Sequence, residues 1–392
     1  MALDYAGSSR ARTRARRIES GAASFVGRFD WLMLGAVAAL VGYGLHLVAG
    51  ITRDDVLGDP DYYVLRQAVY AGLGAAGMVG AALLDPDVYR RYWRHLYGIA
   101  IVLLALVIPL GTEARGSQRW IGVGSVSFQP SELGKLLVIL TVAGFLAERA
   151  RRIGELGTVL SAIGLAGAPA LLVFLQPDIG TSLVYAAALA AMLFVAGARW
   201  LHLGALVSLT AILVLAVVWF LPSIGVDVLE PYQRDRLTAF VNRDHDPQGA
   251  SYNVEQSILA IGAGGVRGRG VENATQTNLD YLPEHATDFA FASLAEQRGF
   301  AGAAILLLLY LLLVWRGLRV VTYAPDAYCA IVAGGIVFAL LFQVFVNVGM
   351  TMGIAPVTGI PLPFVSVGGS SLITNLLAVG VLQAIHARGR PR

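Results

Sequence analysis

The sequence is poor in charge and nearly devoid of cysteine and lysine. Only 14% of its 392 residues are charged, whereas a soluble globular domain carries about 25%. With 56% hydrophobic residues, the chain lacks the polar side chains needed to cover a water-soluble globule. Its one cysteine, Cys329, excludes an internal disulfide and any site with several cysteine ligands. We therefore expect a multi-pass membrane protein, and exclude a secreted, disordered or zinc-finger protein.

What the sequence has instead is a series of apolar runs, each long enough to cross a hydrocarbon core of about 30 Å. They predict an all-α polytopic membrane protein, a bundle of about ten transmembrane helices, at 31–50, 67–84, 96–111, 131–147, 157–175, 180–197, 201–221, 294–315, 327–349 and 368–386. The predicted segments are a basic cytoplasmic tail (1–29), spans one to seven (30–221), a long extracytoplasmic loop (222–293), spans eight to ten (294–387) and a cytoplasmic tail (388–392).

The distribution of the arginines indicates which loops lie on the cytoplasmic side of the membrane. Eighteen lie in the two tails and in the loops on the same side as those tails, and four lie in the short loops on the opposite side. Because the excess of basic residues marks the cytoplasmic side, both termini are expected in the cytoplasm. The net charge of +3 is thereby explained, and we predict no nucleic-acid partner.

Charged residues interrupt the apolar pattern at the mouth of the fourth span. Pro130 and Ser131 are a typical helix start, with Ser131 as a possible cap. Glu132 and Lys135 follow three residues apart, so they share a helix face and can pair. Two interpretations stay open: a structural ion pair within the bundle, or a functional site, which is the default for ionisable residues inside a membrane.

A second interruption is the short segment Gln176–Thr181, which separates two apolar runs. Its aspartate, Asp178, is the only charge between Glu155 and Arg199. A tight turn with a capping aspartate explains the segment. A broken helix that presents Asp178 to a polar cavity explains it equally well.

The long loop contains an amphipathic stretch at 251–261, expected at or in the membrane interface. A glycine-rich turn follows at 262–270, with Arg267 and Arg269 between the glycines. It is either a flexible loop or a place where exposed backbone N–H groups and arginines hold a phosphate.

Two further polar segments enter spans eight and ten. In the first, we expect Thr287 to cap the helix and Asp288 to lie in its first turn. In the second, Ser370 follows a proline-rich entry, as a cap or as a hydroxyl lining a cavity. These segments all fall on the predicted outer face, and their charges suit an anionic, polar ligand that arrives from the lipid.

These motifs make the sequence similar to the SEDS family (shape, elongation, division and sporulation). The resemblance covers residues 30–388 and rests on Gln118–Ile121, Phe128–Lys135, Gln176–Thr181, Leu282–Phe289 and Pro363–Ser371. Asp246–Asn253 and Ala274–Leu279 resemble the RodA branch rather than the FtsW branch.

The resemblance implies a peptidoglycan glycosyltransferase that polymerises lipid II at the outer face of the bacterial plasma membrane during cell elongation. It also implies a class B penicillin-binding protein, a transpeptidase, as partner. The family's essential aspartate corresponds to Asp288. Family members usually read Pro-Glu-x-His-Thr-Asp, whereas here His285 directly follows Glu284 and Ala286 takes the usual histidine place. No role is therefore transferred to His285.

For the mechanism we expect Asp288 to be the general base for the attacking sugar hydroxyl, with Arg119 and Lys135 stabilising the leaving pyrophosphate. We expect Lys135→Ala to reduce activity far more than stability.

No organic cofactor is expected, but a divalent cation, Mg²⁺ or Mn²⁺, is compatible with Glu132, Asp178 or Asp288. A lipid II transporter (flippase) and a non-catalytic scaffold that activates a penicillin-binding protein are the alternatives. The complete predicted substrate-binding set is Arg119, Glu132, Lys135, Asp178, Glu284, Arg267 and Ser370.

Overall fold

The structure is a computed structural model. It describes residues 27–389 except 54, 57, 115, 116, 124, 125, 226–232, 234, 235, 237–239 and 241–249. Three predicted features lie outside the described residues: most of the basic tail, residues 246–249 of the RodA-like motif, and the arginines Arg390 and Arg392.

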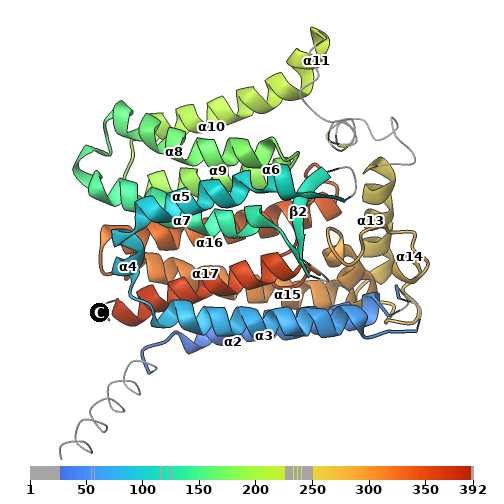
Figure 1. Cartoon of the computed structure of the whole chain (residues 1–392). Helices are drawn as coiled ribbons and strands as arrows, with labels where there is room; N and C mark the ends of the chain where they lie inside the picture. The colour runs from blue at the N-terminus through green and yellow to red at the C-terminus, as the bar shows by residue number, and fades with distance from the viewer. Residues whose placement is uncertain are drawn as a thin grey trace, which may run out of the picture.

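Long helices lie side by side in a bundle (Figure 1). They are α2 (Trp31–Ile51), α3 (Tyr62–Leu83), α5 (Trp93–Ala105), α6 (Val107–Leu110), α7 (Pro130–Glu148), α8 (Leu156–Phe174), α9 (Ile179–Val195), α10 (Trp200–Leu215), α15 (Ala290–Thr322), α16 (Ala327–Thr351) and α17 (Gly369–Arg388). Shorter elements are α4 (Pro86–Arg91), the 3₁₀ turn η1 (Ala150–Arg152), the π turn η2 (Ala216–Phe220), α11 (Leu221–Ser223), α13 (Ala250–Gly264) and α14 (Thr275–Asn278).

The predicted fold class is confirmed: the chain is a helical, multi-pass membrane protein. Among the described residues, seven segments are long and apolar enough to cross a membrane: α2, α5 with α6, α7, α8, α15, α16 and α17. The shorter apolar helices α9 and α10, together with α3, coincide with the three other predicted spans. Every predicted span therefore has its helix.

The bundle is built around α7, whose residues are buried along almost its entire length. Helix α16 packs against α7, α9 and α15, while α3 lies along α17. Helix α10 lies at the periphery, and only Leu206 of its side chains is buried. Its exposed leucines and Ile212 suit contact with lipid tails, because lipid tails are as apolar as these side chains.

The two ends of the bundle differ in structure. The arginine end, on the left of Figure 1, carries α4, η1 and the C-terminus of α17. The cavity end, on the right, carries α13, α14 and a three-stranded antiparallel sheet of β1 (Thr112–Ala114), β2 (Ser117–Val123) and β3 (Val126–Phe128). Sequence analysis did not predict these strands. They pair Thr112 with Trp120 and Ile121 with Phe128, and so fix the polar segment before α7.

The predicted amphipathic stretch lies in α13, which crosses the ends of the long helices (Figure 1). Its buried residues Ser251, Val254, Ser257 and Ala260 follow one another at three-residue spacing, so neighbours in the series are adjacent and together they cover about half of the helix surface. Ser257 Oγ donates to the carbonyl of Thr351 at 2.7 Å. This face is fixed against α16, while Leu259 on the other side is exposed.

The glycine-rich turn is held against α15 by backbone hydrogen bonds. The N–H groups of Arg269 and Gly270 donate to the carbonyls of Glu296 and Gln297, at 2.9 and 3.0 Å. Helix α15 is broken there by Gly299, at φ 64°, a conformation that favours glycine. Since the two backbones satisfy each other, these N–H groups are not available to an anion.

Candidate functional site

A cavity of about 380 Å³ opens at the cavity end of the bundle. It is enclosed by the sheet, the turn before α15, the connection between α16 and α17, and the first residues of α17. Its lining combines apolar surface with polar side chains, among them two arginines and one aspartate. The lining residues are Thr112, Arg119, Trp120, Ser127, Gln129, Arg236, Thr287, Asp288, Gly359, Pro361, Val367, Gly368 and Ser371.

Asp288 lies in the turn before α15 and not in the first turn of the helix, because α15 begins at Ala290. Thr287 does not cap this helix, contrary to our expectation; its hydroxyl donates to the Glu284 carboxylate at 2.7 Å. The backbone of this turn is fixed from α16, where the buried Asn347 side chain donates to the carbonyls of Asp288 and Ile360 at 2.9 and 2.8 Å. The position of Asp288 is thus set by neighbouring segments.

Gly359 brings Arg236 and Asp288 to the same wall of the cavity. Its φ is +72°, and a side-chain carbon at this position would lie 2.8 Å from Arg236 Nη1 and 3.4 Å from Asp288 Oδ2. A residue with a side chain would therefore meet both groups and strain the backbone. The absent side chain leaves a guanidinium and a carboxylate close together beside the cavity.

Arg119 reaches the cavity from β2 and is held by the start of α9. Its guanidinium donates to the carbonyl of Pro177 and lies 4.0 Å from Asp178 Oδ1. Asp178 caps α9 through the N–H of Thr181 at 3.1 Å and accepts from the Gln129 amide at 3.1 Å. Asp178 is therefore both the capping aspartate and a neighbour of Arg119, and it does not itself line the cavity.

Glu132 and Lys135 lie within the first turns of α7 and form an ion pair. Lys135 Nζ is 3.0 and 2.9 Å from the two Glu132 carboxylate oxygens. Both residues are buried, Glu132 at 1% and Lys135 at 7% exposure. Neither lines the 380 Å³ cavity. The geometry favours the structural-pair interpretation over direct contact with a ligand.

None of the remaining predicted binding residues lines the cavity. Ser370 is buried, and its hydroxyl accepts from the backbone N–H of Gln129 at 2.9 Å; the neighbouring Ser371 lines the cavity instead. Glu284 is engaged with Thr287. Arg267 is exposed on the glycine-rich turn and lies outside the lining.

The three carboxylates expected to be compatible with a divalent cation, Glu132, Asp178 and Asp288, lie in different surroundings. Glu132 is neutralised by Lys135 and Asp178 lies beside Arg119. Over the described part of the chain, these three carboxylates do not form a group with converging ligand atoms. The expectation of a cation at one of them stays a prediction.

Arg236 and Gly359 are the site residues that sequence analysis missed. Arg236 comes from the long loop, far from Asp288 in sequence and outside any periodic pattern. The only signal at Gly359 was its place among Pro356, Pro361 and Pro363, which indicates an irregular connection but not its neighbours. Their proximity is a consequence of the tertiary fold.

Comparison with known proteins identifies the family. Residues 30–390 match the model of the FtsW, RodA and SpoVE family, described as "Cell cycle protein". The chain is 42% identical over 357 residues to the peptidoglycan glycosyltransferase MrdB of Escherichia coli K12, covering 91% of this chain and 93% of that protein.

Two solved structures are also similar. The Rod shape determining protein RodA of Thermus thermophilus matches with a TM-score of 0.68 and 30% identity, over 93% of this chain and 98% of that one. A chain from a peptidoglycan synthase complex, solved to explain how polymerisation and crosslinking are coordinated, matches with a TM-score of 0.78 and 32% identity, over 91% and 97%. The RodA-like resemblance is confirmed, and the chain belongs to the SEDS family of peptidoglycan glycosyltransferases.

Proposed function

We propose that this glycosyltransferase polymerises lipid II in the 380 Å³ cavity, with Asp288 as the general base. The observation that carries the proposal is that a carboxylate and two arginines, Asp288, Arg119 and Arg236, line one cavity. In the reaction, the 4-hydroxyl of a GlcNAc unit attacks the anomeric carbon of a MurNAc unit linked to undecaprenyl pyrophosphate.

The proposed step is a single displacement. The new bond joins the acceptor oxygen to the anomeric carbon, while the bond from that carbon to the pyrophosphate oxygen breaks. The hydroxyl proton passes to the Asp288 carboxylate, and the undecaprenyl pyrophosphate leaves with the electron pair. An α-linked donor then gives a β-linked product. General-base assistance of this kind contributes about 10²–10⁴-fold to the rate.

The leaving pyrophosphate gains negative charge as its bond to the sugar breaks. Preorganised cations stabilise such charge without rearranging, and Arg119 and Arg236 supply them in this proposal. Arg119 is prepositioned by Pro177 and Asp178. Lys135, our earlier candidate, is replaced by Arg236 because its ammonium is paired within the bundle. We derive no step through a metal ion.

We further propose that the cavity faces the outside of a bacterial plasma membrane, with both termini in the cytoplasm. The clusters Arg90–Arg94 and Arg149–Arg152 both lie at the arginine end, and the positive-inside rule assigns such an end to the cytoplasm. The expected partner is a class B penicillin-binding protein. This expectation is supported by one similar structure, which belongs to a complex that combines polymerisation with crosslinking.

The test is polymerisation of lipid II by purified Asp288→Asn and Asp288→Glu in the presence of the partner. Asparagine keeps the shape and removes the proton acceptor, so we expect at least about 100-fold less glycan polymer. Glutamate keeps the acceptor and should retain part of the activity. Full activity in Asp288→Asn would exclude Asp288 as the base.

A further inference from the structure

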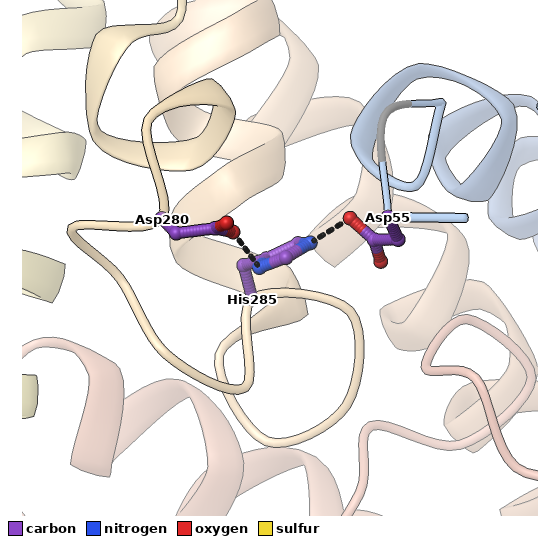
Figure 2. Close-up of side chains that lie close together, drawn as sticks. All are labelled: Asp55, Asp280 and His285. Carbon is purple, nitrogen blue, oxygen red and sulfur yellow. Dashed lines mark ion pairs between the residues drawn. The ribbon is translucent and has the colours of Figure 1, made fainter. Parts of the chain in front are cut away.

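A second polar cluster lies at the cavity end, outside the glycosyltransferase cavity. Figure 2 shows the His285 ring between the side chains of Asp55 and Asp280. Asp55 comes from the connection between α2 and α3, and the other two residues from the segment before α15. His285 Nε2 lies 3.3 Å from Asp55 Oδ1, and Nδ1 lies 4.0 Å from Asp280 Oδ1. None of the three lines the cavity.

The histidine is buried, and one of its ring nitrogens lacks a well-aligned hydrogen bond. His285 is 8% exposed, and its Nε2 makes no hydrogen bond although it lies 3.3 Å from Asp55 Oδ1. Buried polar atoms almost always have a partner, so an exception of this kind needs a physical explanation. A proton on the ring or a bound cation would each satisfy the cluster.

The distances favour a cation. A protonated imidazole between two carboxylates should draw both into charge-assisted hydrogen bonds of about 2.7–2.9 Å, yet the Nδ1–Asp280 distance is 4.0 Å. One ligand atom from each of the three residues lies within 4.8 Å of the other two. Around a tetrahedral ion with ligands at about 2.1 Å, ligand atoms lie about 3.4 Å apart. The cluster must therefore contract by up to about 1.4 Å. Asp280, which lies nearest the other ring nitrogen, has an exposed side chain that can make this movement.

The backbone that carries the histidine is already fixed. Ser293 Oγ donates to the His285 carbonyl at 3.1 Å, and the N–H of Val367 donates to the Ala286 carbonyl at 2.9 Å. Such preorganisation lowers the entropic cost of assembling a metal site. An ion bound here would join the α2–α3 connection to the turn that ends in Asp288.

We propose that Asp55, Asp280 and His285 form a binding site for a divalent transition-metal ion, with Zn²⁺ preferred over Mn²⁺ and Mg²⁺. An imidazole nitrogen suits Zn²⁺, carboxylate oxygens also bind it, and mixed nitrogen and oxygen sites generally bind Zn²⁺ more tightly than Mn²⁺. The nitrogen ligand discriminates against Mg²⁺, which prefers oxygen. The site is separate from Glu132, Asp178 and Asp288 and does not depend on the proposed mechanism.

The test is metal binding by the purified full-length chain in detergent after removal of metal with a chelator. Calorimetric titration with Zn²⁺ should give one site that is lost in His285→Gln and weakened at least tenfold in Asp280→Asn. Asp280 has a positive φ of 54°, which asparagine tolerates, so this second variant should fold even if His285→Gln does not. His95→Gln, at an exposed histidine of the arginine end, is the matched control and should bind as the parent does.

A second measurement is independent of activity. Zn²⁺ should raise the thermal unfolding midpoint of the parent and of His95→Gln, because it binds only the folded state, and should leave that of Asp280→Asn nearly unchanged. Equal Zn²⁺ affinity in the parent and both site variants would overturn the proposal, as would equal affinity of the parent for Zn²⁺ and Mg²⁺. Absence of Zn²⁺ binding would leave the cluster as an ion-paired histidine only, which also overturns it.

Discussion

At the arginine end, charged side chains join one helix end to another, whereas at the cavity end they converge on a space. Asp30 illustrates the first arrangement: it caps α2 and accepts from Arg316 Nε at 2.7 Å, while Gln383 of α17 bonds to its backbone. Arg388 and Asp85 likewise connect the ends of α17 and α3–α4. Each of these charges is matched by a partner on another helix.

At the cavity end, the same residue types face a space large enough for part of a ligand. Arg119, Arg236 and Asp288 come from the sheet, the long loop and the turn before α15, and line the cavity together. The role of a charged side chain in this membrane protein therefore depends on what it contacts. Ion pairs away from the cavity predict stability, and charges lining the cavity predict chemistry.

The largest effect on stability is expected at the buried ion pair of α7, Glu132 and Lys135. Lys135→Met should lower stability by about 3–5 kcal/mol, because Glu132 is left as a buried, unpaired charge. The measurement is the thermal unfolding midpoint in detergent. The double variant Glu132→Gln with Lys135→Met should recover most of the loss. If Lys135→Met kept the parent's unfolding midpoint but lost polymerisation activity, Lys135 would have a direct role in substrate binding.

A smaller effect is expected at Gly359. In Gly359→Ala, the methyl group would contact Arg236 and approach Asp288, so we expect a loss of about tenfold in polymerisation rate, equivalent to about 1.4 kcal/mol. Gly197→Ala is the matched control, because Gly197 has a similar φ of +87° with open space around its Cβ position. Both variants carry the same backbone strain, so equal activity in the two would contradict the proposed wall of the cavity.

The smallest effect is expected at Ser370. Ser370→Ala removes one hydrogen bond to Gln129 and should cost about 1 kcal/mol of stability with little change in KM for lipid II. Ser371→Ala should instead raise KM, since Ser371 lines the cavity. A raised KM in Ser370→Ala alone would support the binding role that the sequence first indicated.

The fold was largely predictable because hydropathy is a local property. The predicted run 327–349 corresponds to α16 at Ala327–Thr351, and 157–175 to α8 at Leu156–Phe174. The prediction for span eight was less accurate, because α15 continues from Ala290 to Thr322 through a break at Gly299. The short strands were missed since a three-residue strand such as Val126–Phe128 has almost no period of its own.

The site was only partly predictable, because a motif identifies a residue without its neighbours. Asp288 and Arg119 were identified from their motifs, and both line the cavity. Arg236 and Gly359 were missed because only the folded chain brings them beside Asp288. Lys135 was assigned to the leaving group from its charge and its motif, and neither can show that its ammonium is enclosed with Glu132.

The most direct test of the account compares one aspartate from each end, Asp288→Asn and Asp30→Asn, for both lipid II polymerisation and thermal unfolding. We predict that Asp288→Asn loses at least about 100-fold in rate with an unchanged unfolding midpoint. Asp30→Asn should lower the midpoint, because Arg316 loses its buried partner, yet keep its rate at temperatures where it is folded. Retained activity in Asp288→Asn, or a midpoint that falls in parallel with its activity, would contradict the assignment of chemistry to the cavity end.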